Sequence, residues 1–314
     1  FRWLGDNTEY GAYFMNYHSR TPFLSMKNAE ASAMAGLGAV AGAFDPFAGQ
    51  LPPGFTPTML AGAALAVGNG NYFMDYPEDI RLYGLSFSTT LPTGTAWQGE
   101  ISYRPNAPVQ INTQDLTLSI AAPALGMLGS PVPAWQNKNF GGLQRGYNRK
   151  EITQVQTTFT HFFDQVLGAS RATVVGEVGF THVGGLESKG KIRYGRSPDF
   201  GSPTSFTDPS AEGEYGWHGF VTKNSWGYRV RGILDYSSAF AGVNLHPNVA
   251  FSHDVDGYGP NGQFNEGSKA VSFGLDADYQ NTYTAGLSYT NFFDGRYNTL
   301  KDRDFVSLSF GMNF

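Results

Sequence analysis

Apolar and polar residues alternate along much of the chain, most clearly toward its C-terminal end. In the segment 269–280, one set of alternate positions holds Val271, Phe273, Leu275, Ala277 and Tyr279, and the other holds Ser272, Gly274, Asp276 and Asp278. The same alternation continues in 283–290 and again in 306–314. A period of two that persists this long predicts β-strands with one apolar and one polar face.

The pattern recurs upstream and predicts about ten strands in an all-β chain. They are expected within residues 8–20, 79–91, 97–104, 154–159, 171–181, 228–236, 243–252, 269–280, 283–290 and 306–314. Several exceed the five or six residues typical of globular sheets. Tyr, Phe and Trp gather toward strand ends on the apolar face, as in the aromatic girdles of membrane barrels. These features favour a transmembrane antiparallel up-and-down β-barrel over a β-sandwich, with this chain forming the whole barrel or part of a larger one.

The links between the expected strands are alternately short and long. Short links fall near 92–94, 164–170, 239–242 and 281–282, and long links near 21–78, 106–148, 185–224, 255–267 and 295–302. Outer-membrane barrels have short periplasmic turns and long outer loops. We therefore expect one barrel domain over 1–314, with its C-terminus in the periplasm and extracellular insertions near 21–78, 106–148 and 185–224.

The two ends of the sequence bear on location. The last expected strand ends at Phe314, and a final strand ending in Phe is what outer-membrane barrels present to the barrel assembly machinery. The bacterial outer membrane is therefore the expected location, with its lipid and that machinery as partners. No signal peptide is visible before Phe1, so a leader has been removed or N-terminal sequence is missing.

The segment 28–70 differs in character from the strands. It is rich in Ala, Gly and Met, and two short helices are expected on either side of Pro52-Pro53. Its longest apolar run, Met59 to Val67, is about half the roughly 20 residues that a membrane helix needs. An apolar insertion on the outer side needs a partner. It could cover the barrel mouth, plug the lumen, capture hydrophobic molecules or pack against other loops.

Charged residues on the polar faces are the candidate solute-contact residues. A cationic side chain facing lipid at the midplane would cost roughly 2–4 kcal/mol, so these faces should line the lumen. The charges could brace the wall or select solutes. Arg229 and Arg231 are the first candidates for contact with an anionic or amphiphilic solute. The full set is Arg229, Arg231, Asp235, Arg171, Glu177, Glu100, Arg104, Asp276 and Asp278.

Several other functions are disfavoured. A net charge of −5 without a basic run argues against nucleic acid as a partner. The six His residues lack ligand spacing, so no metal or other cofactor is expected. The loop from Asp254 to Glu266 carries oxygen ligands and glycines, but its spacing departs from the EF-hand pattern. A solvated hairpin loop is favoured there over a calcium site.

Catalysis is also not expected. A lipid hydrolase or acyltransferase needs a nucleophile and a base within reach of each other, yet His18–Ser19 and Ser252–His253 are the only adjacent pairs. Neighbours on a strand point to opposite faces. The leading hypothesis is a channel for passive passage of hydrophobic or amphipathic small molecules. A general water-filled diffusion pore, a barrel-borne lipid-modifying enzyme and a surface adhesin or scaffold are the alternatives.

Four stretches resemble an outer-membrane family known only as domain-of-unknown-function family 1302. They are Thr8–Arg20, Tyr76–Ser86, Arg193–Arg196 and Val249–Asp254. Members of that family are roughly twice as long, so the resemblance implies that Phe1 lies within the barrel and that an N-terminal half is absent. The aromatic strands and the apolar outer insertion are also similar, at the level of fold, to long-chain fatty-acid transporters.

Overall fold

A computed structural model describes residues 1–51, 54–203 and 212–313. The chain is rich in β-structure, with 49% of residues in strands and 17% in helices. Eleven antiparallel strands form one large sheet, and three short strands form a second, small sheet. None of the helices in these described ranges is long and apolar enough to cross a membrane. Pro52-Pro53 and the terminal Phe314 lie outside the described residues.

In the large sheet, every strand is hydrogen-bonded to its neighbours in chain order once the short strands of the small sheet are set aside. The order is β1 (Arg2–Leu4), β2 (Thr8–Tyr17), β5 (Ile80–Thr90), β6 (Ala96–Gln110), β8 (Tyr147–Asp164), β9 (Arg171–Gly184), β10 (Asn224–Phe240), β11 (Val243–Asp256), β12 (Lys269–Tyr279), β13 (Tyr283–Phe293) and β14 (Phe305–Met312). The expectation of about ten long antiparallel strands is confirmed, and the three-residue β1 is added to them.

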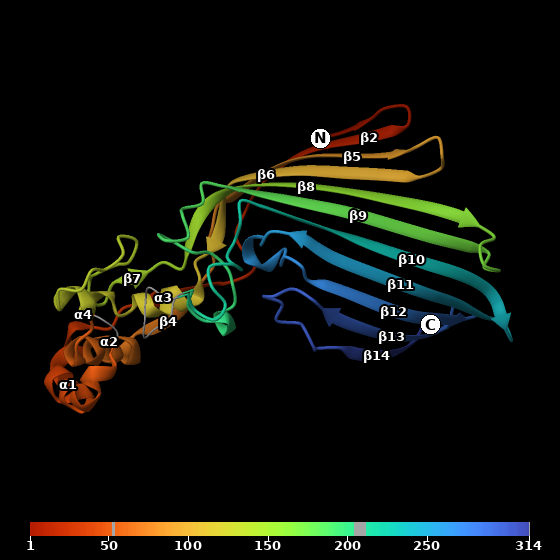
Figure 1. Cartoon of the computed structure of the whole chain (residues 1–314). Coiled ribbons are helices and arrows are strands. Elements are labelled where there is room, and N and C mark those ends of the chain that lie inside the picture. The colour runs from red at the N-terminus through yellow and green to blue at the C-terminus, as the bar shows by residue number, and fades with distance from the viewer. Residues whose placement is uncertain (52–53, 204–211, 314) are drawn as a thin grey trace.

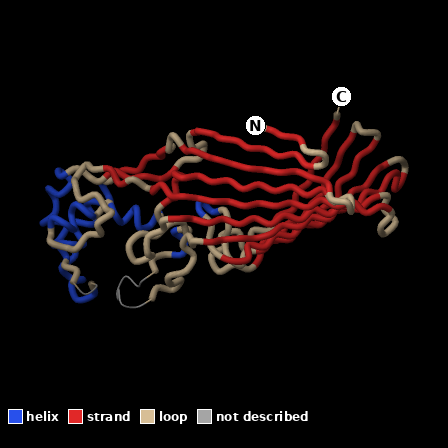
Figure 2. Tube along the Cα trace, turned by 90° about the horizontal axis from the view of Figure 1, so that it is seen from above, coloured by secondary structure: helices blue, strands red, loops and turns tan. Residues whose placement is uncertain are grey.

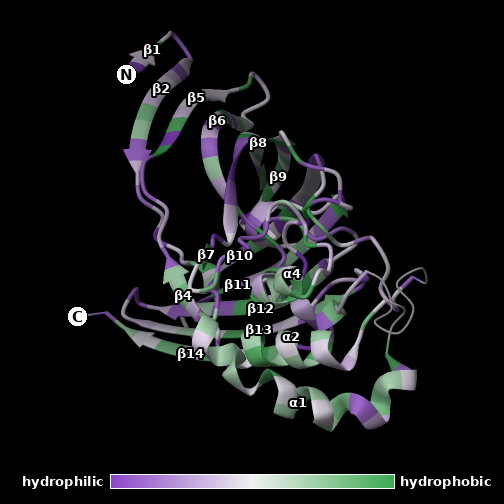
Figure 3. Ribbon diagram, turned by 90° about the vertical axis from the view of Figure 1, so that its left-hand side faces the viewer, coloured by the Kyte–Doolittle hydropathy of each residue, from purple (hydrophilic) through white to green (hydrophobic). Residues whose placement is uncertain are grey.

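The large sheet is curved along its width into an open trough. Seen along the strands, it bends from β1 round to β14, and the two edge strands face the same open side (Figure 3). Among the described residues, no hydrogen-bonded pairing joins β1 to β14, which are the two ends of the order. The coarse prediction of an antiparallel all-β sheet therefore holds, and closure into a barrel becomes part of the proposal below.

Short and long links lie at opposite ends of the sheet (Figure 1). The link between β12 and β13 is a tight turn, in which the amide of Thr282 donates to the carbonyl of Tyr279 at 3.0 Å. Its two central residues, Gln280 and Asn281, have φ of 52° and 53°. Positive φ at both positions is the hairpin geometry that matches the twist of the flanking strands, and Asn tolerates it well.

The opposite end carries a body of loops, helices and the small sheet. The small sheet consists of β3 (Phe23–Lys27), β4 (Asn71–Asp75) and β7 (Leu143–Gln144). The α-helices are α1 (Leu37–Phe44), α2 (Pro57–Asn69), α3 (Thr113–Ser119) and α4 (Ala122–Met127), with 3₁₀ turns at Ala31–Gly36, Asp45–Gln50, Pro198–Phe200 and Pro260–Gly262. Figure 2 shows the α-helices at one end of the large sheet, away from the short turns at the other end.

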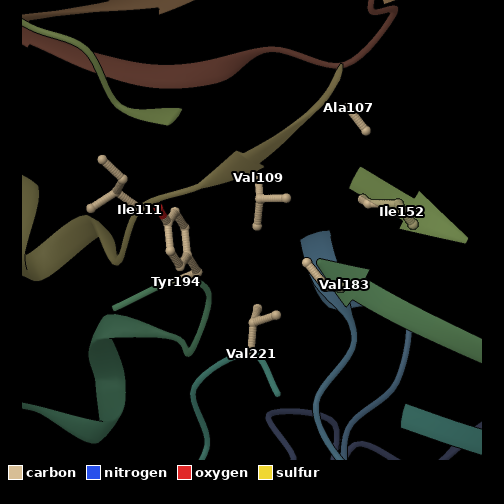
Figure 4. Packing of buried hydrophobic residues seen from close by; sticks show 7 residues of the cluster. All are labelled: Ala107, Val109, Ile111, Ile152, Val183, Tyr194 and Val221. Atoms are coloured by element: carbon tan, nitrogen blue, oxygen red, sulfur yellow. The ribbon is translucent and has the colours of Figure 1, made fainter. Parts of the chain in front are cut away.

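A small apolar core joins this outer body to the sheet. Val109 and Val183 are almost fully buried there, beside Tyr194 and Val221 from the long loop after β9 (Figure 4). Ala107, Ile111 and Ile152 complete the cluster. Burial of one large aliphatic side chain stabilises by about 1.5–3 kcal/mol. The cluster therefore fixes the loop between β9 and β10 against the outer ends of β6, β8 and β9.

Short helices in the 28–70 insertion were expected and are present. Thr56 caps α2 by accepting a 3.2 Å hydrogen bond from the amide of Met59, and Pro57 takes the first helical position, where no amide is needed. A Cβ on Gly62 would lie 3.5 Å from Cβ of Ala124, so α2 packs closely on α4. Both α1 and α2 lie beyond the strand ends (Figure 1). The described part of the insertion therefore does not plug the trough.

Candidate functional site

One face of the large sheet is apolar from edge to edge. The strand register aligns Leu85, Ile101, Val155 and Phe180 in one row. At the other edge, Leu275, Leu287 and Leu308 form a second row. Many of these side chains are open, with Leu287 51% and Leu308 64% exposed. The apolar face is thus a continuous exposed surface and not the inside of a packed sandwich.

The opposite face is polar and forms the inside of the trough. All nine charged residues predicted from the sequence lie on this inner face, because their strand positions have the opposite parity to the apolar rows. Across β9 and β10, Arg229 is the register partner of Glu177, and Asp235 is the partner of Arg171. The structure divides the nine residues into two groups and leaves one apart.

The first group lines a hollow of about 230 Å³ on the inner face. It contains four of the predicted residues, Glu100, Arg104, Glu177 and Arg229. Glu177 accepts hydrogen bonds from Gln156 at 2.8 Å and from Thr158 at 3.3 Å. Arg104 donates to the Gln154 side chain at 2.5 Å. Amide side chains therefore position the charges, and the two carboxylates and two guanidiniums do not neutralise each other in direct ion pairs.

The second group lies nearer the short turns and is organised by His246, which was not among the predicted site residues. The imidazole Nδ1 lies 2.7 Å from Asp235, and Nε2 lies 2.9 Å from Asp278. A neutral imidazole can donate from only one nitrogen. With both carboxylates ionised, the two bonds therefore need the imidazolium. His246 lies on the polar face opposite Asp276 in the register. The residues around His246 in the sequence give no sign that it has two carboxylate partners.

Arg231 and Asp276 join the second group through a shared amide. Asn248 donates to Asp276 at 3.0 Å, and its carbonyl oxygen accepts from Arg231 at 3.3 Å. The proposed Arg229–Arg231 pair is thus divided, since Arg229 lines the first hollow while Arg231 is tied into this network. Arg171 stands apart at the short-turn end, where its closest ion-pair partner is Asp164 at 3.8 Å.

A loop that follows β11 crosses the inner face, which sequence reasoning missed. Gln263 accepts a 3.1 Å hydrogen bond from Thr181 on β9, and Asn261 donates at 3.1 Å to the carbonyl of Pro108 on β6. Phe264 is only 6% exposed, and its ring covers Gly179 on β9. We call residues 257–268 the inner loop. It joins the antiparallel strands β11 and β12 as the expected hairpin loop, but residues 257–260 and Phe264 are buried, so the expectation that the loop is solvated was wrong for this part.

The acidic residues at the two ends of the inner loop hold its backbone. Asp254 accepts from the amide of Asn265 at 2.9 Å, and Glu266 accepts from the amide of Gly257 at 3.1 Å. Gly257 has φ of 77°, and a Cβ there would lie 2.1 Å from the carbonyl oxygen of Asn224. Among the described residues, no group of three or more His, Cys, Asp and Glu could hold a metal ion.

The adjacent His–Ser pair near the start of the chain is engaged in backbone contacts. The Nδ1 atom of His18 accepts a 3.2 Å hydrogen bond from the amide of Asp79. The Ser19 hydroxyl donates to the carbonyl of Thr21 at 2.7 Å. Each side chain thus has a partner other than its neighbour, and these contacts brace the entry and exit of the long link between β2 and β5.

The comparison with known families supports the resemblance seen in the sequence. No curated relative matches the chain. The likeness to long-chain fatty-acid transporters stays a prediction. One family model, described as Protein of unknown function (DUF1302), matches residues 1–314. The chain belongs to this family over its entire length.

Proposed function

We propose that this chain forms all or part of the wall of an outer-membrane β-barrel. This barrel lets hydrophobic or amphipathic small molecules pass passively across the bacterial outer membrane. The observation that carries the proposal is the division of one large sheet into two faces. The outer face is apolar and exposed across all eleven strands, and the inner face is polar, charged and partly filled by the inner loop.

The outer face has the chemistry and length required to contact lipid. A tilted barrel strand needs about 9–11 residues to span the hydrocarbon layer, and β5, β12 and β13 each have 11. Exposed apolar patches on monomeric soluble proteins rarely exceed a few hundred Å². The apolar surface runs through every strand of the sheet, from the row of Leu85 to the row of Leu287. Contact with a lipid bilayer therefore explains this surface better than contact with water does.

The backbone N–H and C=O groups at the two sheet edges also need hydrogen-bonding partners within a bilayer. Unpaired backbone groups in hydrocarbon cost several kcal/mol each, so membrane sheets occur as closed barrels. In the proposed membrane-embedded form, the free edges of β1 and β14 pair with each other or with further strands. Either arrangement encloses the inner face as a lumen.

The inner face suits selective passage better than a wide aqueous pore. The inner loop narrows the trough at the level of Glu177 and Arg229, where charges of both signs lie among amides. Charge pattern and pore width are the two determinants of solute choice in such channels. At the outer end, exposed apolar side chains such as Phe47, Met74 and Met127 give hydrophobic molecules a surface to bind before entry.

The second candidate is a general water-filled diffusion pore. The polar lining of the inner hollows favours it, since a path lined by Gln154, Gln156 and Glu177 can hold water. The two candidates differ in how freely ions pass. A diffusion pore gives a large steady conductance, whereas a narrowed path for amphipathic solutes gives a small one.

Conductance in planar lipid bilayers tests the proposal. The full chain is compared with a variant in which residues 259–264, the tip of the inner loop, are replaced by two glycines. We expect low conductance from the full chain and a severalfold increase from the variant. A matched control replaces residues 92–94, in the turn between β5 and β6 at the opposite end of the sheet, with two glycines, which leaves the inner loop intact and should change little. A large steady conductance from the intact chain would favour the diffusion pore, and failure to insert into bilayers would overturn both candidates.

A further inference from the structure

A second cavity lies beside the inner loop, nearer the outer body. Its volume is about 460 Å³, within the roughly 300–1,000 Å³ of pockets that hold small organic ligands. Strand residues Arg229 and Phe292 form one wall, and Tyr258, Phe264 and Tyr297 from the outer loops form another. We call it the outer cavity. The first hollow, which contains Glu100, Arg104 and Glu177, lies on the other side of the inner-loop tip.

The lining of the outer cavity is amphipathic. Phe264, Phe292 and Leu300 supply apolar surface, and the rings of Tyr258 and Tyr297 pack edge to face with centroids 5.6 Å apart. Three cations, Arg196, Arg229 and Lys269, face one acidic residue, Asp254. A pocket with this composition suits a ligand that has an apolar body and a negative group.

The three cations differ in how far they are already engaged. Lys269 lies 2.9 Å from the carboxylate of Asp294. Arg196 donates to the carbonyls of Gly216 and Gly201 and stacks over the ring of Phe220 at 4.2 Å. Arg229 is exposed and interacts electrostatically with Asp254, but within the described ranges its side chain makes no hydrogen bond and no close ion pair. It is therefore the cation left to meet a ligand.

Some residues in the wall of the outer cavity also carry unsatisfied polar atoms. The described chain contains buried side-chain atoms without a hydrogen-bond partner in three residues that line the outer cavity, namely Arg196 Nε, Asn265 Oδ1 and Ser268 Oγ. A buried polar atom left unpaired costs about 1–3 kcal/mol. Because each of these atoms is covered by protein, a ligand would satisfy it only if the cavity wall rearranged on binding.

Arg229 also connects the outer cavity with the inner hollow. Arg229, Gln263 and Phe264 line both spaces. A solute in the outer cavity would therefore meet the Phe264 ring and the Arg229 guanidinium together before it reaches Glu177. One residue can thus hold the solute and guide it past the loop tip.

We infer that the outer cavity binds a small amphipathic carboxylate, with its carboxylate on the Arg229 guanidinium and its apolar body against Phe264 and Phe292. Arginine matches a carboxylate with two parallel hydrogen bonds, which gives both affinity and orientation. This inference rests on the proposed channel function and narrows its solute class to organic anions.

Binding of three compounds that share one body tests the inferred site. The probes are 4-phenylbutanoate, 4-phenylbutanol and 4-phenylbutylamine, titrated calorimetrically into the full chain in lipid nanodiscs. We expect the carboxylate to bind most tightly and the ammonium compound least. Equal affinity for the three probes would overturn the inference without any variant having to fold.

Substitutions then locate the site. Arg229→Gln should weaken phenylbutanoate binding about tenfold, the size expected when one charge-assisted hydrogen-bonded contact is lost. Arg231→Gln is the matched control, since Arg231 lies on the same strand and face but does not line the outer cavity. A loss of binding in Arg231→Gln equal to that in Arg229→Gln would contradict the assignment.

The two proposals fail in different ways. If phenylbutanoate binds through Arg229 but the chain gives neither conductance nor solute flux in bilayers, the site stands and the channel proposal falls. If flux occurs but the carboxylate has no advantage over the alcohol, the channel stands and the carboxylate site falls.

Discussion

The hydroxyl of Thr181 donates a 3.1 Å hydrogen bond to the side-chain carbonyl of Gln263, which lies 82 residues later in the chain. Thr181 is fully buried on the inner face of β9. Because β10 separates β9 from β11 in the sheet, the bond carries the inner loop across a neighbouring strand. The loop is therefore anchored at its tip as well as at its two ends.

Loss of this anchor should loosen the tip. In Thr181→Val, the side-chain carbonyl of Gln263 loses its donor, at a net cost of about 0.5–1.5 kcal/mol. We expect faster amide hydrogen exchange across residues 258–265 and little change in the strands. Thr173→Val on the same strand and face is the control, since Thr173 has no such bond to the inner loop. Equal exchange in the two variants would mean that the anchor contributes little.

A charge placed on the two faces of β13 should have opposite consequences. Leu287 is 51% exposed on the apolar face, and Ser288 follows it on the inner face. Leu287→Arg should destabilise the folded protein in lipid vesicles by about 2–4 kcal/mol, because the guanidinium would face hydrocarbon. Ser288→Arg should be tolerated. Urea titration in vesicles measures both, and similar stability of the two variants would contradict a lipid-facing outer surface.

The ion pair between Lys150 and Glu187 should stabilise the outer body. Lys150 donates to both carboxylate oxygens, at 2.7 and 2.8 Å, and its side chain is only 8% exposed. Tyr194 donates to the same carboxylate at 2.7 Å. Lys150→Met leaves this carboxylate without its cation and should lower the stability of the outer body by about 1–3 kcal/mol. Limited proteolysis of the loop between β9 and β10 would detect the loss. Lys138→Met, in the outer body but without such a pair, is the control.

The same carboxylate predicts an acid-sensitive contribution to stability. Burial by itself would raise the pKa of Glu187, but hydrogen bonds from Lys150 and Tyr194 outweigh burial and hold the pKa below its ordinary value of 4.5. A depressed folded-state pKa gives stability that is complete above the unfolded pKa and is lost as pH falls through the folded value. The stability difference between the natural chain and Glu187→Gln should therefore be largest near neutral pH and shrink below 4.5. A difference that stays constant through the acid range would contradict this.

In the proposed channel, removal of His246 should make the lumen more selective for cations. The imidazole lies between Asp235 and Asp278, and in His246→Ala the two carboxylates face the lumen without it. We expect the reversal potential in a salt gradient to shift toward the cation equilibrium potential. His253→Ala, on the opposite parity of the same strand, should leave the potential unchanged. An equal shift in both variants would argue against a lumenal role for His246.

The sequence predicted those parts of the fold that depend on local alternation. Long strands such as Lys269–Tyr279 carry enough periods of two to be recognised. The strands Arg2–Leu4 and Leu143–Gln144 are too short to show a period, and they exist because neighbouring strands offer them hydrogen-bonding partners. The helices at α1 and α2 were expected from composition, while α3 and α4 were not.

The candidate site was predicted in its chemistry but not in its arrangement. Parity alone placed Arg229 and Arg231 on one face, yet only tertiary structure distinguishes the unpaired Arg229 from Arg231, which binds Asn248. The inner loop was missed for the same reason. Its position depends on contacts with Thr181 and Pro108, which are distant in sequence, and its glycines alone fit an ordinary surface loop equally well.

The chain-order pairing of the large sheet also affects how such a protein can change over evolutionary time. Within the sheet, each strand is hydrogen-bonded only to the strands before and after it in the order. A duplication or deletion of one hairpin would therefore need no change in the order of the remaining strands. The width of the wall can vary in steps of two strands while the outer body, held through β6, β8 and β9, is inherited unchanged.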